Sequence, residues 1–475
     1  MDEQIDRRDA EAGDAIGDLV TGTMSRDDFI RRMTVLGFSA TAIGGMLAGA
    51  GVAGAATDRR FAGQTVSILV AAEGDEKGVQ DKIPEIKKRF GIDVKMTALP
   101  VGPLNEKLSQ NVKAPTSSFD AIMVLGFTVS AFVGGGFFDP LNKYVKTKAP
   151  KGYDFPHDFP AGELQYVGYY DVKHQRFGGN TLYLIPGLHG GSVVLYYRKD
   201  LFAKAGLRPP TSWGAYLNAA KKLNTGGVAG NSMIAKSGDV SMFLCDWYTR
   251  FVNMGGILMS GSPQTKNYRP RLTSPAAVAA LQHMVECVKY ASPGVLSYDF
   301  TVSTNAFSAG QTAMMMIWST IAGPVYNPKT SKVANKTGVA VPPGKGQAVR
   351  GGWGMGIPKN AKAENKDAAW TVIAYLTSKE WERYQTLKYQ TDPTRNSTFF
   401  SPAMNAKLPY LSTAGKVFQK ARILEIASIP ETFELITDAA VEFSAALNGS
   451  ATAAQACKKA NDKWISVLKR GGHLK

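Results

Sequence analysis

The segment TVSILVAAEGDEKGVQDKIPEIKKRFGIDVKMTAL, residues 65–99, decides the fold class. It opens with Thr65–Ala71, a short β-branched apolar run that is typical of a buried strand. Apolar side chains then recur at helical spacing as far as Phe90, and Gly91 is placed to end this helix. Ile92–Leu99 predicts a second strand. This strand–helix–strand order predicts an α/β fold built on a mostly parallel sheet covered by helices.

Predicted strands and helices continue along the chain. Phe119–Leu125 predicts a third strand of the sheet, either Thr211 or Ser212 can cap a helix that includes Trp213, and Ser274-Pro275 opens another helix. Further helices are predicted toward the C-terminus. A chain of 475 residues with 44% hydrophobic residues can bury more than one core, so we expect two globular units.

The sequence holds no catalytic or metal-binding signature. It lacks HExxH, GxSxG and Walker-type motifs, and its five histidines do not have zinc-ligand spacing. Cys245, Cys287 and Cys457 show no CxxC spacing and allow at most one disulfide. We therefore expect a protein that is not an enzyme and that carries no cofactor and no metal.

Residues 1–56 predict an export signal of twin-arginine-like layout. Arg31 and Arg32 precede MTVLGFSATAIGGMLAGAGVAGAA, an uncharged stretch that ends in small residues. Asp27 stands where the usual S-R-R-x-F pattern has its second arginine, so the twin-arginine and general secretory routes both stay open. We expect cleavage near Ala55 and a soluble periplasmic protein, with a retained membrane anchor as the alternative.

The chain beyond the signal is strongly basic. After residue 56 there are 50 Lys and Arg against 30 Asp and Glu. The basic residues are scattered and are not interleaved with stacking aromatics, so we expect no nucleic-acid partner. The positive electrostatic field of a chain with this excess could attract an anionic solute.

Four segments, taken in order, resemble the family 1 extracellular solute-binding proteins, the group that contains the maltose-binding protein. They are SFDAIMVLGFTVSAFVGGGFFDPLNKY (118–144), LIPGLHGGSVVLYYRKDLFAKAGLRPPTSWGAYLNAAKKL (184–223), FSAGQTAMMMIWS (307–319) and GGWGMGIPKNAKAENKDAAWTVIAYLTS (351–378). The second segment is the most specific, because its tyrosine pair, its Lys-Asp-Leu-Phe turn and its Pro-Pro-x-x-Trp helix entry recur in that family as a unit. The resemblance covers nearly all of the chain after Gly63.

This resemblance implies a type II periplasmic-binding-protein fold, in which two hinged lobes, each a mostly parallel sheet flanked by helices, close on a solute. It also implies the membrane permease of an ABC transporter as partner, and we expect a monomer. The implied ranges are 57–186 plus 347–391 for the N-terminal lobe and 187–346 plus 392–475 for the C-terminal lobe, with crossings near 186–192, 342–347 and 391–397.

The resemblance places candidate ligand-binding residues in loops that face the cleft. A sugar needs polar partners for its hydroxyls and an aromatic plane for its apolar face. The candidates are Glu73, Gly74, Phe127, Thr128, His189, Gly190, Asp246, Trp247, Trp318, Gly352, Trp353, Glu431 and Phe433. Each also has a structural interpretation: core packing for the tryptophans, and solvation or a lysine partner for Glu73 and Asp246.

We therefore predict the periplasmic substrate-binding component of an ABC importer, with a sugar or polyol as ligand. A sugar phosphate or another anionic sugar derivative stays open, for which Lys77, Arg176 and Arg350 are the nearest cations. One alternative is an exported carbohydrate-active enzyme, with Glu73 and Asp246 as its carboxylate pair. The other is a ligand-binding sensory module.

Overall fold

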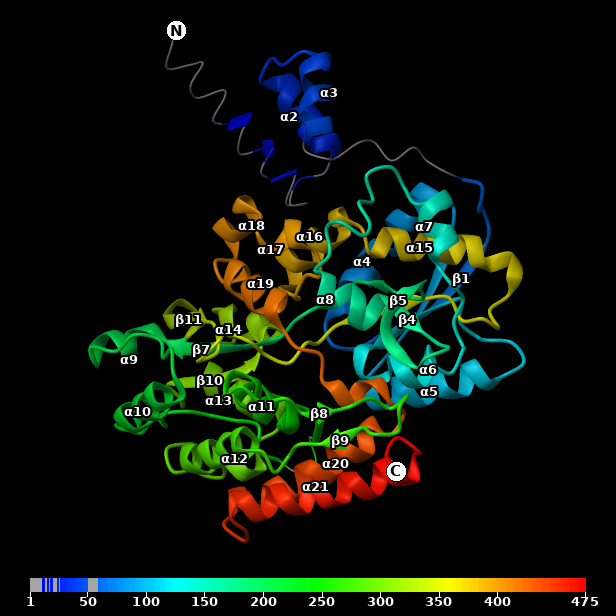
Figure 1. The fold of residues 1–475 in the computed structure, drawn as a ribbon. Helices are drawn as coiled ribbons and strands as arrows, with labels where there is room; N and C mark the ends of the chain where they lie inside the picture. The colour runs from blue at the N-terminus through cyan, green and yellow to red at the C-terminus, as the bar shows by residue number, and fades with distance from the viewer. Residues whose placement is uncertain are drawn as a thin grey trace.

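The computed structural model describes residues 11–12, 15–16, 18–19, 24, 26–49, 59–236, 238 and 240–475. Within these residues the chain forms two α/β lobes, each around its own sheet, together with a helical pair near the N-terminus (Figure 1). The two-lobed α/β fold expected from the sequence is confirmed.

The larger sheet belongs to the N-terminal lobe and has the strand order β2-β1-β3-β12-β6. Its strands are β1 (Thr65–Ala71), β2 (Asp93–Leu99), β3 (Ala121–Leu125), β6 (Ile185–Pro186) and β12 (Trp353–Gly356). β1, β2 and β3 are parallel, whereas β12 runs antiparallel to both β3 and β6. Because Trp353 pairs with Leu125, the start of β12 lies beside the end of β3. The loops after β1 and β3 therefore meet the start of β12 at one edge of the sheet.

Helices α4 (Asp75–Phe90), α5 (Val101–Lys113) and α15 (Lys366–Leu376) pack against this sheet. α4 ends where the sequence predicts, since Gly91 adopts a left-handed conformation with φ 71° and its N–H bonds the carbonyl of Lys87. The other elements of this lobe are α6 (Val129–Phe132), α7 (Asn142–Lys148), α8 (Ala161–Glu163), a π-helical turn (Leu164–Gly168), β4 (Tyr169–Asp171), β5 (Arg176–Leu182) and α16 (Lys379–Tyr389).

The smaller sheet belongs to the C-terminal lobe and has the order β10-β7-β11. Its strands are β7 (Val193–Arg198), β10 (Met314–Trp318) and β11 (Thr337–Ala340). Both outer strands run antiparallel to β7, which differs from the mostly parallel sheet expected for this lobe. The reason is that β7 starts at the first crossing and leads away from it, whereas β10 returns to the crossing, so that Trp318 pairs with Val193.

Helices α11, α12, α20 and α21 pack on one another at the far side of this lobe, as Figure 1 shows in green, orange and red. Two predicted helix starts are confirmed, because the side chain of Ser212 accepts from the N–H of Ala215 and Pro275 is the first residue of its helix. The helices of this lobe are α9 (Lys199–Lys204), α10 (Trp213–Leu223), α11 (Val240–Asn253), α12 (Pro275–Val288), α13 (Phe300–Ser308), α14 (Ala322–Tyr326), α17 (Asn396–Phe399), α18 (Pro402–Lys407), α19 (Leu411–Lys420), α20 (Thr432–Leu447) and α21 (Ala453–Arg470), with a short hairpin of β8 (Met259–Ser260) and β9 (Arg269–Pro270).

The chain crosses between the lobes in segments that lie side by side. The N–H of Gly190 donates to the carbonyl of Asp392 at 3.1 Å, and the N–H of Gly351 donates to the carbonyl of Gly191 at 3.1 Å. The second crossing is the segment around Gly351 that pairs with the first crossing. It thus lies just after the range 342–347 that was expected from the sequence. The lobe boundaries drawn from the sequence stay predictions.

The N-terminal segment forms α2 (Arg26–Val35) and α3 (Ala40–Gly49). Phe29, Met33 and Ile43 belong to a small apolar core separate from that of the lobes. Among the described residues, no helix has the length and apolar character needed to cross a membrane. The expected cleavage position near Ala55 lies outside the described residues.

Gly190 lies so close to the third crossing that a side chain has no room there. A Cβ atom at Gly190 would lie 2.3 Å from the backbone oxygen of Pro393. We expect Gly190→Ala to lower the free energy of unfolding by about 1–3 kcal/mol in urea titrations, because two backbone segments must separate. The control is Gly214→Ala in α10, where a Cβ meets nothing within 4 Å and stability should hold or rise. Equal stability of the two variants would contradict this packing.

Candidate functional site

A group of side chains gathers where the carboxyl edge of the larger sheet meets the first and third crossings between the lobes. We call Glu73, Asp75, His189, Trp353 and Asp392 the His189 cluster. Glu73 and Asp75 follow β1, Trp353 begins β12, and the other two lie on the first and third crossings. They meet because the ends of β1 and β3 lie at the same edge as the start of β12.

The centre of the cluster is a buried contact between an imidazole and a carboxylate. Nδ1 of His189 lies 3.0 Å from Oδ2 of Asp75, and Nε2 of Gln385 donates to the other Asp75 oxygen at 2.7 Å. Burial opposes a charge on His189, but the carboxylates of Asp75, Glu73 and Asp392 outweigh it and raise the pKa of His189 to about 9. The imidazole is therefore cationic and can donate from its second nitrogen.

Glu73 lies in a concave position. Its side chain is exposed, yet it is surrounded by enough protein for desolvation to raise its pKa. His189 and a hydrogen bond with the Trp353 side chain act in the opposite direction. The Trp353 side chain itself is buried. Glu73 thus presents acceptor oxygens beside an aromatic plane.

Asp392 brings a second carboxylate from the third crossing. The hydroxyl of Ser319, just after β10, donates to Oδ2 of Asp392. Burial raises the pKa of Asp392 to about 6, against the effects of Ser319 and His189. Its Oδ1 atom has no hydrogen-bond partner among the described residues. This oxygen can accept one more hydrogen bond.

A second polar group lies between the lobes, and we call Glu163, Tyr166 and Arg350 the Arg350 cluster. Nη1 of Arg350 lies 3.4 Å from Oε2 of Glu163. Nη2 of Arg350 donates to the carbonyls of Phe418 and Ala421, at 2.8 and 3.1 Å, at the C-terminal end of α19, where a cation is favoured. Burial raises the pKa of Glu163 to about 7, although Arg350 opposes this. Arg350 is thus anchored on one lobe and faces a carboxyl of the other.

The structure brings several predicted site residues together. Glu73, His189 and Trp353 form the His189 cluster, with Gly74, Gly190 and Gly352 beside them in the chain. The ring of Trp318 packs on the second crossing, because a Cβ at Gly351 would lie 2.4 Å from it. Phe127 contacts Tyr166 edge-on with ring centroids 6.4 Å apart, and Thr128 follows it in the chain.

Trp247 and Asp246 lie elsewhere, and the ligand-stacking expectation for Trp247 needs correction. Its ring is 0% exposed and stacks on Phe251 with centroids 4.8 Å apart. Its Nε1 atom donates to the carbonyl of Ala277 at 3.3 Å. Asp246 is buried against Arg250, one turn further along α11. Both residues are enclosed among the helices of the C-terminal lobe.

The remaining candidates lie at the surface or have other partners. Nε2 of His473 lies 2.9 Å from the carboxylate of Glu431, and Phe433 at the start of α20 is 40% exposed. Lys77 is exposed, and Arg176 is an exposed residue that pairs with Asp171. Of the three cations considered for an anionic ligand, Arg350 is the one that lies between the lobes.

Sequence reasoning preferred Glu73 to Asp75 in the loop after β1, and it missed Asp392, Glu163 and Tyr166. Asp75 was within reach, since it follows β1 in the same loop as Glu73. Glu163 lies in a three-residue helix and Tyr166 in a π-helical turn, and no residue spacing in the sequence predicts either element. Among the described residues, no group of His, Cys, Asp and Glu is arranged to hold a metal ion, and the three cysteines are buried and form no disulfide.

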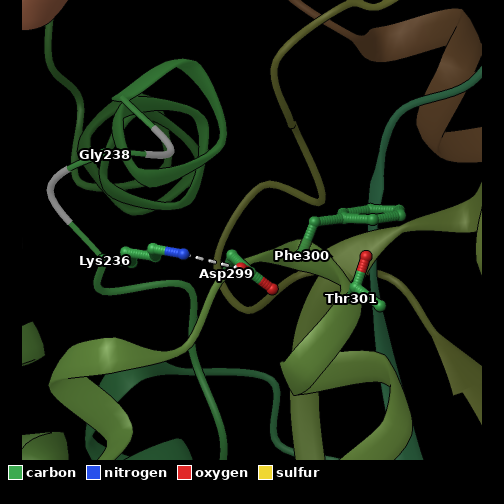
Figure 2. A pocket seen from close by; sticks show the side chains of 5 residues that line it. All are labelled: Lys236, Gly238, Asp299, Phe300 and Thr301. Carbon is green, nitrogen blue, oxygen red and sulfur yellow. Dashed lines mark hydrogen bonds and ion pairs between the residues drawn. The ribbon is translucent and has the colours of Figure 1, made fainter. Parts of the chain in front are cut away.

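Two surface hollows lie away from both clusters. One, of about 290 Å³, is lined by Lys236, Gly238, Asp299, Phe300 and Thr301. Nζ of Lys236 lies 3.0 Å from the carboxylate of Asp299, which also caps α13 (Figure 2). The other, of about 300 Å³, has Lys345, Lys416 and Lys420 at its rim.

Comparisons with known proteins identify the family of the chain. The family model for bacterial extracellular solute-binding proteins matches residues 72–383. A probable amino-acid ABC transporter periplasmic-binding protein of Sinorhizobium fredii is 26% identical over 433 residues, covering 89% of this chain and 94% of the relative. The mannitol-binding protein of Pseudomonas aeruginosa is 23% identical over 410 residues, with 81% and 88% covered. A solute-binding protein of Agrobacterium radiobacter K84, crystallised with ribitol, aligns with a TM-score of 0.73 and 25% identity over 87% of this chain and 100% of that one.

The raised pKa of His189 predicts a pH dependence of stability. A folded-state pKa of about 9 against the usual 6.5 means that the protonated imidazole stabilises the fold fully below pH 6.5, and that this contribution is lost as the pH rises through 9. The difference in unfolding free energy between the wild type and His189→Gln should therefore shrink between these pH values in urea titrations.

The control for this titration is His283→Gln. Burial and Arg250 lower the pKa of His283 to about 3, so it is neutral throughout that window and its contribution should not change with pH. A His189 difference that stays constant from pH 6.5 to 9 would contradict the assignment.

Proposed function

Because the chain belongs to the bacterial extracellular solute-binding proteins, we propose that it is the periplasmic receptor of an ABC importer and binds an uncharged polyol or sugar between its lobes. The observation that carries the proposal is the His189 cluster, in which carboxylates, a cationic imidazole and an indole converge where the N-terminal lobe meets the crossings. Relatives named for mannitol and crystallised with ribitol support the solute class.

The chemistry of the cluster suits hydroxyl groups. Each hydroxyl of a polyol both donates and accepts a hydrogen bond. Glu73 and Asp392 offer acceptor oxygens, and the protonated His189 offers a donor. The indoles of Trp353 and Trp318, which are 3% and 7% exposed, supply apolar packing beside these polar groups.

The charge of the cluster disfavours an anionic solute. Glu73, Asp75 and Asp392 surround a single imidazole, which is already paired with Asp75. Arg350 faces the carboxyl of Glu163 and donates to two backbone carbonyls. At the His189 cluster a phosphate would meet carboxylates and no unpaired cation, so we favour a neutral polyol over a sugar phosphate.

Contacts between the lobes support closure around the solute. Nε2 of Gln264, in the loop between β8 and β9, donates to the carbonyl of Gln175 at 3.0 Å, at the turn between β4 and β5. The hydroxyl of Ser130 donates to the carbonyl of Ile429 at 3.3 Å. A solute that binds the closed state better shifts the lobes toward it and so forms the surface that a permease recognises. We propose a monomeric receptor that docks to such a permease.

Three other functions have weaker support. An exported enzyme would need its second carboxylate, but Asp246 is enclosed with Arg250. An amino-acid receptor is suggested by the name of the Sinorhizobium fredii relative. It would need a free cation for the α-carboxylate of its ligand, whereas His189 is engaged by Asp75. A sensory role would use the same cleft.

Calorimetric titration with single solutes tests the proposal. The panel holds ribitol, D-mannitol, maltose, L-glutamate and sn-glycerol 3-phosphate, each below about 1 mM so that general osmolyte stabilisation is negligible. We expect saturable binding of a neutral polyol or sugar and a matching rise in melting temperature. Binding of L-glutamate or of the phosphate ester alone would contradict the proposed solute class.

A further inference from the structure

The Arg350 cluster contains three buried polar atoms that lack partners. Oε1 of Glu163, the hydroxyl of Tyr166 and Nε of Arg350 have no hydrogen-bond partner within the part of the chain that the structure describes. All three residues are at most 1% exposed. A buried polar atom left unpaired costs about 1–3 kcal/mol, so a group of three is unusual in a folded protein.

An ion pair alone does not account for this group. The closest contact between Arg350 and Glu163 is 3.4 Å, longer than the about 2.7–2.9 Å of a tight charge-assisted bond. Arg350 is fixed instead by the two carbonyls at the end of α19. Glu163 therefore keeps one oxygen loosely paired and the other unpaired.

Glycines bring the backbone directly against the cluster. A Cβ at Gly352 would lie 2.1 Å from Oε1 of Glu163, and a Cβ at Gly126 would lie 2.4 Å from the ring of Tyr166. Gly352 precedes Trp353 of the His189 cluster, and Gly126 precedes the loop of Phe127. The two clusters are thus neighbours along the second crossing, at the same edge of the sheet.

Both lobes contribute to this group. Glu163 and Tyr166 come from the N-terminal lobe, whereas Arg350 is held by α19 of the C-terminal lobe. Tyr166 also interacts electrostatically with Cys245 of α11. When the lobes separate, solvent can reach all three polar atoms, and when they close, a molecule enclosed with them can partner them.

We propose that Glu163, Tyr166 and Arg350 form a second subsite for the same solute, which binds a pair of neighbouring hydroxyls. This inference rests on the proposed function. Oε1 of Glu163 accepts from one hydroxyl, Nε of Arg350 donates to the other, and the Tyr166 hydroxyl serves either. Because the Glu163 carboxyl lies beside the Arg350 guanidinium, the subsite offers an acceptor and a donor to neighbouring hydroxyls.

The variant Tyr166→Phe tests the subsite, because it removes one hydroxyl that has no protein partner. We expect its Kd for ribitol or D-mannitol, whichever the wild type binds, to rise about five- to tenfold in calorimetry. Its unfolding free energy without solute should be equal to or higher than that of the wild type, because an unpaired polar atom is lost. A merely structural tyrosine would not show this combination.

The matched control is Tyr216→Phe. Tyr216 is also fully buried with an unpaired hydroxyl, but it packs on Trp213 and His283 within the C-terminal lobe. Its affinity for the same polyol should equal that of the wild type.

Three results would overturn the subsite, and they can be told apart. A wild type that binds polyols and a Tyr166→Phe variant of equal affinity would refute the subsite and leave the proposed function intact. A loss of affinity accompanied by a loss of unfolding free energy would assign Tyr166 a structural role. A wild type that binds neither polyol would refute the proposed solute class and the subsite together.

Discussion

The cost of enclosing polar atoms without hydrogen-bond partners governs the region between the lobes. Oδ1 of Asp392, Oγ of Ser192, Nε1 of Trp318 and Oε1 of Gln385 are buried and unpaired at the crossings, in addition to the atoms of the Arg350 cluster. Water satisfies such atoms when the lobes are apart. A polyhydroxylated solute can satisfy them when the lobes are together. Closing the lobes without a solute therefore costs free energy. A solute that partners these atoms lowers that cost, so binding is coupled to closure.

The distribution of charge sets the kind of solute that this region accepts. His189 is a cation held among carboxylates, and Arg350 is held by Glu163 and by the end of a helix. The large positive charge of the chain lies elsewhere, for example on Lys345, Lys416 and Lys420 at an exposed hollow. The basic composition thus describes the outer surface, whereas the cleft combines paired cations with acceptor oxygens.

The parts of the site that follow strand ends were predictable from the sequence. Glu73 adjoins a strand that hydrophobic patterning marks clearly, whereas the family resemblance alone indicated His189 and Trp353 in their glycine-rich segments. The prediction that Trp247 stacks on a ligand beside Asp246 was wrong, because consecutive residues on a helix point in different directions. Arg250, four residues after Asp246, was the signal for an internal pair. Glu163 and Tyr166 were out of reach, since long-range packing alone brings them beside Gly352 and Gly126.

The distance between the two loops that Gln264 joins, one from each lobe, tests most directly whether solute binding is coupled to closure. Lys173 and Thr265 are exposed residues on the two loops joined by Gln264, and the native cysteines are buried, so spin labels can be placed at Lys173→Cys and Thr265→Cys. Double electron–electron resonance should show a long, broad distance distribution without solute and a short, narrow one with a saturating polyol. A short, narrow distribution in both conditions would contradict the account.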